Sequence, residues 1–196
     1  NNKIICAFEK IENVRCNEPL TYFEFGTLAA LDILSNSYID YLILEVGLGG
    51  RLDAVNVIDP DGSIITNIGL DHMDWLGDSK EKIGHEKAGI MRDNITTVYG
   101  ELDPPNSIKD IAHDKGADLI IMGEDYIYEN SLNGLWSWHG RCNKRENLES
   151  LSFKGSHQVK NVSAALALLE SLNSKELASE KMINKAMKCI HLEGRL

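Results

Sequence analysis

The segment from Leu42 to Val57 constrains the fold of this chain more than any other stretch of its 196 residues. An apolar run that ends at Leu44 is typical of a strand covered on both faces, as in a parallel sheet. The sequence therefore predicts a strand over residues 41–46, with Glu45 at its carboxyl end, where open α/β sheets bind their ligands. The loop that follows reads GLGGRLD. Its glycines allow a sharp turn and a close approach to a ligand.

The same arrangement is repeated downstream. Ser63 to Ile68 is a second apolar, β-branched run, and Gly69 to His72 follows it. If the two strands are parallel neighbours, Glu45 and His72 lie on the same rim of the sheet. A carboxylate and an imidazole that converge there could hold a divalent metal, although a hard cation such as Mg²⁺ usually prefers oxygen ligands.

Residues 79–92 have the charge spacing of a helix but include Gly84 and Gly89. Glycine costs a helix about 1 kcal/mol relative to alanine. We therefore expect the two glycines to permit close packing or a close ligand, with Lys87 between them.

Strand and helix patterns alternate along most of the chain. The expected strands are residues 3–8, 41–46, 63–68, 95–99 and 119–122, and the expected helices are 21–35, 79–92, 105–115, 159–169 and 175–188. This alternation predicts an α/β fold with a mainly parallel, doubly wound sheet flanked by helices. Residues 125–153 are aromatic and rich in turns, which indicates a small antiparallel excursion packed by Trp136 and Trp138.

Composition and charge exclude several classes of partner. The formal net charge of −10 argues against nucleic acid or an anionic membrane. Four scattered cysteines without a CxxC pair fit reduced thiols and no structural zinc, and there is no long apolar span. We expect a cytoplasmic protein. Because the chain starts with Asn1 rather than Met, we also expect it to be part of a longer one.

The glycine loop also has a dinucleotide-binding interpretation. Leu52 stands where the third glycine of that fingerprint belongs, and no helical pattern begins there. We therefore reject this interpretation. Structural interpretations remain for single residues: Glu45 as a strand-end acid, His72 as a turn residue, and Lys87, Asn161 and Arg195 as solvated surface groups.

Five blocks in order along the chain closely resemble the folylpolyglutamate synthase family of the Mur ligase superfamily, including its bacterial bifunctional dihydrofolate synthases. The blocks are LEVGLGGRLDAVNV, TNIGLDHMDWLG, EKAGI, GSHQVKNVSAAL and EGR. The resemblance implies the central ATPase-type, P-loop-NTPase-like domain of such an enzyme. It also implies an ATP-dependent amide ligase that adds L-glutamate to dihydropteroate or to folate polyglutamate chains through an acyl phosphate.

The resemblance assigns roles to particular residues. Glu45 and His72 match family positions that bind Mg²⁺, and Lys87 matches a lysine that family members carry as a carbamate. Lys87 and Asp53 are the expected catalytic residues. The expected substrate-binding residues are Thr21, Tyr22, Phe23, Glu24, Leu52, Asp53 and Ala54, with Phe23 as the stacking ring, and the expected nucleotide-binding residues are Asn161 and Arg195.

The chain departs from the family pattern in what it lacks. It contains no GxxxxGK[ST] phosphate loop. The family carries a glycine-rich one, and a metal-binding serine, upstream of the segment that Asn1 begins. We expect residues 1–193 to be an incomplete central domain, and 194–196 to start the connection to a missing carboxyl-terminal domain. This chain by itself should then be inactive, and the full-length protein a monomer. Two alternatives stay open: a Mur-type ligase acting on a cell-wall precursor, and a non-catalytic binding module with the same fold.

Overall fold

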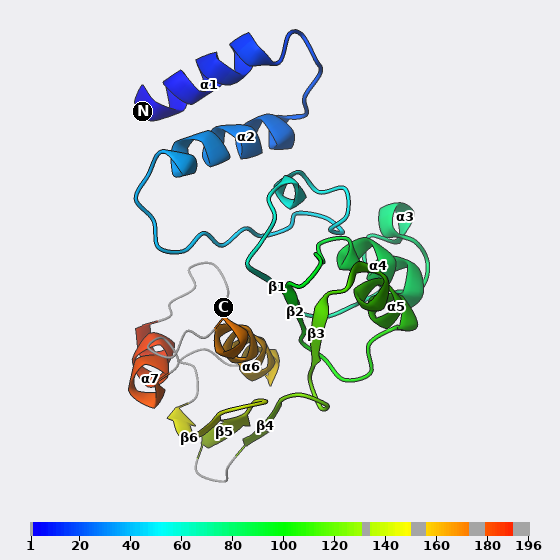
Figure 1. The fold of residues 1–196 in the computed structure, drawn as a ribbon, viewed down its shortest axis with the longest axis vertical. Helices are drawn as coiled ribbons and strands as arrows, with labels where there is room; N and C mark the ends of the chain where they lie inside the picture. The colour runs from blue at the N-terminus through cyan, green and yellow to red at the C-terminus, as the bar shows by residue number, and fades with distance from the viewer. Residues whose placement is uncertain (1, 131–133, 150–155, 173–178, 190–196) are drawn as a thin grey trace. The chain divides into compact units, whose positions relative to one another are not determined.

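The computed structural model describes residues 2–130, 134–149, 156–172 and 179–189 (Figure 1). Its contacts divide the chain into two compact units, Asn1–Ile58 and Asp59–Leu196, called here the first and second units. Each unit has its own buried residues. Within the described ranges, no helix has the length and apolar composition needed to cross a bilayer.

The first unit begins with helix α1 (Asn2–Val14) where the sequence predicts a strand over residues 3–8. That prediction is wrong. A short apolar run fits either a strand or a helix, and here the helical spacing of Ala7 and Ile11 decides the outcome. Both residues are buried, and with Ala29 of the next helix they form the small core of this unit.

Helix α2 (Tyr22–Ser35) confirms the predicted helix over 21–35. Thr21 caps its first turn through a capping box: the Thr21 hydroxyl accepts a hydrogen bond from the Glu24 amide, and the Glu24 carboxylate accepts one from the Thr21 amide. The start of this helix is therefore encoded locally, by residues three apart.

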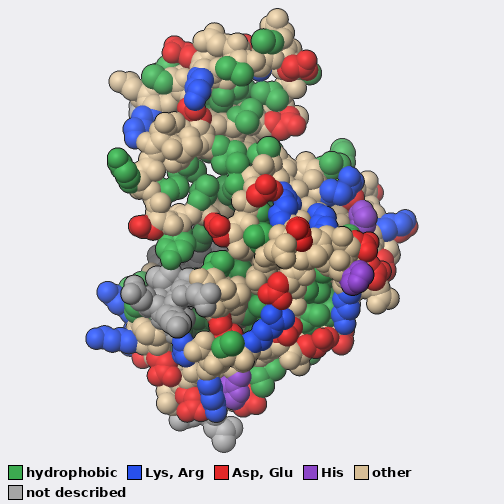
Figure 2. Space-filling view, in the orientation of Figure 1, with side chains coloured by type: hydrophobic (Ala, Val, Ile, Leu, Met, Phe, Trp, Pro, Cys, Tyr) green, Lys and Arg blue, Asp and Glu red, His purple; other side chains and the backbone are tan. Residues whose placement is uncertain are grey.

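The predicted strand over 41–46 is wrong: these residues form neither helix nor strand. A doubly buried strand needs neighbours on its faces and edges, yet Ile43 is 91% exposed and Tyr41 62% exposed in this structure. Apolar side chains reach the surface at many places on the molecule (Figure 2). Glu45 accordingly does not end a strand of the described sheet.

The second unit is built on a parallel sheet of β1 (Gly62–Ile65), β2 (Thr96–Tyr99) and β3 (Asp118–Ile121) in the order β1-β2-β3. In register, Ile65 pairs with Tyr99 and Tyr99 with Ile121. The predicted strands at 95–99 and 119–122 are confirmed to within one residue. The strand predicted over 63–68 exists but ends at Ile65.

Helices cover both faces of this sheet. Tyr99 and Ile121 point to one core, shared with α4 (Lys80–Ala88) and α5 (Asn106–Lys115). Val98 and Ile120, which alternate with them, point to the opposite core, shared with α6 (Ser156–Ser171). The doubly wound α/β prediction is thereby confirmed.

The antiparallel excursion is also confirmed. Strands β4 (Ile127–Asn130), β5 (Leu135–His139) and β6 (Lys144–Glu149) form a meander. Trp136 and Trp138 are 1% and 2% exposed. The indole of Trp138 donates to the carbonyl of Ser163 at 3.2 Å, which joins β5 to α6. Helix α7 (Glu180–Cys189) packs on β6 and overlaps most of the helix predicted over 175–188.

Candidate functional site

Two segments predicted to bind substrate come together in the first unit. A methyl group added at Gly47 would lie 3.4 Å from the Phe23 ring and 3.3 Å from the Asp53 carboxylate. Phe23 comes from the first turn of α2, and Asp53 caps the 3₁₀ turn η1 (Ala54–Val57). Gly47 therefore lies between the ring and the carboxylate, where only a hydrogen fits without displacement.

Asp53 is bound on both oxygens by backbone amides. Its Oδ2 accepts hydrogen bonds from the amides of Gly47 and Leu48, each at 3.0 Å. Its Oδ1 accepts from the Val55 amide at 3.0 Å. Consecutive backbone amides that converge in this way form an anion-binding nest. In this structure the anion bound by the amides of the glycine loop is thus the Asp53 carboxylate of the same loop.

The polar residues of the segment TYFE have a structural role. The Thr21 amide and hydroxyl both donate to Glu24 at 2.7 Å, and the backbone hydrogen bond is the main reason that the pKa of Glu24 is lowered. Tyr22 and Leu52 are 96% and 78% exposed, while Phe23 is 49% exposed. The most exposed large side chains of the two predicted substrate segments are consequently aromatic or apolar.

The two predicted metal ligands belong to different units, Glu45 to the first and His72 to the second. Both are exposed. Nowhere in the part of the chain that the structure describes do three His, Cys, Asp or Glu side chains gather as a metal site. Glu45 and His72 have the oxygen and imidazole donors that a divalent ion accepts, but the described residues do not complete its ligand set.

His72 occupies an unusual backbone position. Its φ of 52° and ψ of 38° are left-handed, and it precedes the single-turn helix α3 (Met73–Leu76). A non-glycine residue with positive φ is uncommon and is found at functional sites more often than elsewhere. The Asp71 carboxylate accepts a hydrogen bond from the His72 amide at 2.8 Å, which holds this turn beyond the end of β1.

Lys87 lies in the last turn of α4 and is half-buried. The helix predicted over 79–92 ends earlier, at Ala88, with Gly89 as its C-cap. Gly84 shows why a glycine stands in this helix, since a methyl group there would lie 2.6 Å from Ser107 Oγ of α5. Of the two explanations expected for it, close packing is the one the structure supports.

The residues that hold α4 in place were missed by the sequence reasoning. Glu81 accepts hydrogen bonds from the first amides of α5, and Lys115 donates to the carbonyls of Gly89, the C-cap of α4, and of Met91 just beyond it. Only the position of Glu81 in the first turn of a helix gave a signal, because acids are favoured there. Its true partner is a different helix.

Of the predicted nucleotide-binding pair, Asn161 is exposed on α6, and Arg195 lies outside the described residues. Beside Asn161, Lys160 makes an ion pair with Glu101 at 3.5 Å. Glu101 follows the carboxyl end of β2 by two residues. The ion pair of Lys160 therefore joins this part of α6 to the segment that follows β2.

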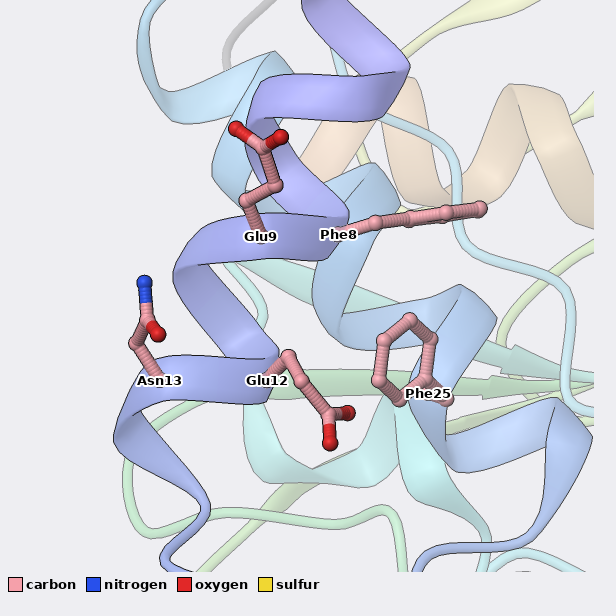
Figure 3. A pocket seen from close by; sticks show the side chains of 5 residues that line it. All are labelled: Phe8, Glu9, Glu12, Asn13 and Phe25. Atoms are coloured by element: carbon pink, nitrogen blue, oxygen red, sulfur yellow. The ribbon is translucent and has the colours of Figure 1, made fainter.

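Two hollows of the first unit are lined by none of the predicted site residues. One, of about 430 Å³, is lined by Phe8, Glu9, Glu12, Asn13 and Phe25, and in Figure 3 its two rings lie next to each other, packed edge to face. The other, of about 930 Å³, lies among α1, α2 and the residues that follow α2. In the first hollow, Glu12 is already paired with Arg15.

Comparison with known proteins identifies the family. The sequence profile of the Mur ligase middle domain matches residues 10–169, so the chain belongs to this family. It is 45% identical over 142 residues to the dihydrofolate synthase/folylpolyglutamate synthase of Escherichia coli, which is 72% of this chain and 33% of that protein. The protein of the same name from Buchnera aphidicola subsp. Acyrthosiphon pisum is 42% identical over 191 residues, 97% of this chain and 45% of the relative.

Solved structures agree. E. coli FolC in complex with ADP superposes with a TM-score of 0.88 at 39% identity, covering 98% of this chain and 45% of that one. The bifunctional folylpolyglutamate synthase/dihydrofolate synthase from Yersinia pestis, complexed with AMPPNP and Mn ion, gives 0.85 at 40% identity, with the same coverage. These matches confirm the predicted fold and family. The chain spans less than half the length of these relatives.

Proposed function

We propose that the protein is an ATP-dependent amide ligase of folate metabolism, which joins L-glutamate to dihydropteroate, to folate polyglutamates, or to both. One observation carries this proposal: at 38% identity and a TM-score of 0.86, the chain superposes on E. coli FolC in complex with DHPP and ADP. The substrate carboxylate would be phosphorylated by ATP. The glutamate amine would then attack the acyl phosphate, forming the amide and releasing phosphate.

Glu45 and His72 would hold a divalent metal, Mg²⁺ in this proposal, which supplies charge neutralisation at the phosphates. A related structure contains Mn, AMPPNP and L-glutamate, which supports the use of a nucleotide and a divalent metal. Lys87 would carry a carbamate, because a carbamate turns a cationic amine into an anionic oxygen group. Asn161 and Arg195 would contact the nucleotide.

The corner of Phe23, Gly47 and Asp53 would receive the pterin ring. Phe23 supplies a half-exposed aromatic face for stacking. Because both oxygens of Asp53 accept backbone hydrogen bonds, we assign this residue to holding the loop and not to proton transfer. Replacement of Asp53 by Asn should therefore raise KM for the pteroate substrate and leave KM for ATP unchanged. A loss confined to kcat would contradict this assignment.

A substrate panel tests the function. Glutamate-dependent release of ADP and phosphate should occur with dihydropteroate, with tetrahydrofolate or with both, and the panel distinguishes the two activities. The Lys87→Arg protein should have no activity, since an arginine cannot form this carbamate. Release of phosphate without glutamate, or activity only with a cell-wall precursor, would refute the folate assignment.

The chain of 196 residues should not catalyse the reaction by itself, because it has no GxxxxGK[ST] loop to bind phosphates. Calorimetry should detect weak or no binding of Mg·ATP, and micromolar affinity would contradict this. We further propose a cytoplasmic location, which the four free, exposed cysteines support. The monomeric state and the incomplete central domain over residues 1–193 stay predictions.

A further inference from the structure

Helices α4 and α5 lie side by side and run in the same direction. At their amino ends, the Glu81 carboxylate of α4 accepts hydrogen bonds from the Asn106 and Ser107 amides of α5, at 3.1 and 2.8 Å. Helix α5 has Pro105 as its N-cap and therefore lacks a capping side chain of its own. Glu81 replaces that cap, and the Ser107 amide is the main cause of its lowered pKa.

The carboxyl ends are joined in the reverse sense. Lys115, the last residue of α5, donates to the carbonyls of Gly89 and Met91 at 3.2 and 3.0 Å. Arg92 Nη1 donates to the same two carbonyls at 3.3 Å, and its Nε is paired with Asp59. Burial lowers the pKa of Lys115, and the nearby Arg92 adds to this.

Contact between the helices is also tight. The backbone of α4 at Gly84 approaches α5 so closely that an added methyl group would lie 2.6 Å from Ser107 Oγ and 3.6 Å from Ile108 Cγ1. Ile83 and Ala88, on either side of this contact, are buried in the core beneath the sheet. Rotation of α4 would therefore meet both the core and α5.

These contacts have a common electrostatic logic. Parallel helices align their dipoles, with positive ends together and negative ends together. Here an acid of α4 binds the positive end of α5, and a cation of α5 lies at the negative end of α4, where it binds the carbonyls of the C-cap Gly89 and of Met91 just beyond it. We call these two contacts the staples. We propose that Glu81 and Lys115 are positioning residues for Lys87: they fix the axial setting of α4, and with it the place of the lysine. This role rests on the ligase function proposed above.

Lys87 lies between the two staples, six residues after Glu81 and two and four residues before Gly89 and Met91, whose carbonyls Lys115 binds. The Lys87 carbonyl accepts a hydrogen bond from the Ile90 amide at 3.3 Å. The turn whose carbonyls Lys115 binds therefore begins at Lys87 itself. Displacement of a reacting group by about 1 Å can cost roughly 100-fold in rate. Loss of a staple should therefore lower kcat more than it weakens substrate binding.

The test compares three variants in the intact protein. Lys115→Met removes the cation and keeps the aliphatic stem, and it should lower kcat by about 10-fold to 100-fold with KM for ATP and pteroate unchanged. Lys115→Arg keeps a cation with several donors and should restore most of kcat. Lys109→Met, on the same helix, removes only an exposed pair with Glu124 at 3.4 Å and should leave kcat unchanged.

A second measurement separates positioning from simple destabilisation. Labelled bicarbonate should give a carbamate NMR signal on Lys87 in the wild type, and this signal should weaken in Lys115→Met at temperatures where that protein remains folded. A wild-type signal together with unchanged kcat in Lys115→Met would overturn the positioning role. Equal losses in Lys115→Met and Lys109→Met would also overturn it. Absence of the carbamate from an active wild type would instead refute the proposed role of Lys87.

Discussion

The two units keep their functional segments in place by different means. Among the described residues of the first unit, the buried hydrophobic side chains are Ala7, Ile11 and Ala29, and the candidate substrate segments are held by hydrogen bonds between residues close in sequence, in the capping box and around Asp53. The second unit has two large cores on opposite faces of a sheet, and its staples connect residues 24 to 26 positions apart. Local hydrogen bonds can order a loop without a large core, whereas a helix is positioned by packing and long-range contacts.

This difference predicts where mutations should destabilise most. Trp138→Ala in the second unit removes a buried indole and its hydrogen bond to the Ser163 carbonyl, and should cost about 3–5 kcal/mol. Phe25→Ala in the first unit removes a half-buried ring that packs against Phe8 and should cost less. Urea unfolding measures both. Equal losses would show that the first unit is as tightly packed as the second.

Two helical glycines provide a sharper comparison. A methyl group at Gly26 of α2 meets nothing within 4 Å, so Gly26→Ala should stabilise the protein by about 0.5–1 kcal/mol. Gly84→Ala gains the same helix propensity but must displace Ser107 Oγ, 2.6 Å away, and should destabilise it by about 1–3 kcal/mol. Thermal unfolding of the two variants should shift in opposite directions. Two shifts of the same sign would contradict the packing difference.

The staple at the amino ends should show itself in the pH dependence of stability. The folded pKa of Glu81 lies below its ordinary value of 4.5. A lowered folded pKa gives stability that is present above pH 4.5 and is lost as the pH falls through the folded value. Glu81→Gln should therefore reduce stability at neutral pH and flatten the decline on the acid side. Denaturant midpoints measured from neutral pH down to the acid transition check this, and an unchanged acid decline would contradict it.

The smallest effect is expected from the exposed ion pair that joins the two helices of the first unit. Lys10 is 63% exposed and pairs with Asp32 across α1 and α2. Lys10→Ala should cost less than about 1 kcal/mol, because water screens exposed pairs and both side chains lose freedom on pairing. A larger loss in denaturant unfolding would mean that this unit depends on charge to hold its helices together.

The sequence predicted the elements whose signals are local. The helical pattern over 21–35 predicted α2, and the apolar segments at 95–99 and 119–122 predicted β2 and β3, each to within one residue. It failed at residues 3–8 and 41–46, where apolar runs too short to show a period were read as strands. The first became a helix because Ala7 and Ile11 meet Ala29, and the second pairs with no described strand.

By itself, then, the sequence determined the α/β class, the family, and which residue types stand in the candidate site, because motifs and periodicity are properties of neighbours along the chain. Only the tertiary structure decided what those residues touch. The Asp53 carboxylate accepts hydrogen bonds from amides of its own loop, and Gly84 faces Ser107 instead of a ligand. Lys115 binds the carbonyl of Met91, just beyond α4 and 24 residues earlier in the chain. A hydrogen bond or a steric contact depends on distance in space, and residues far apart in sequence are brought to that distance only by folding.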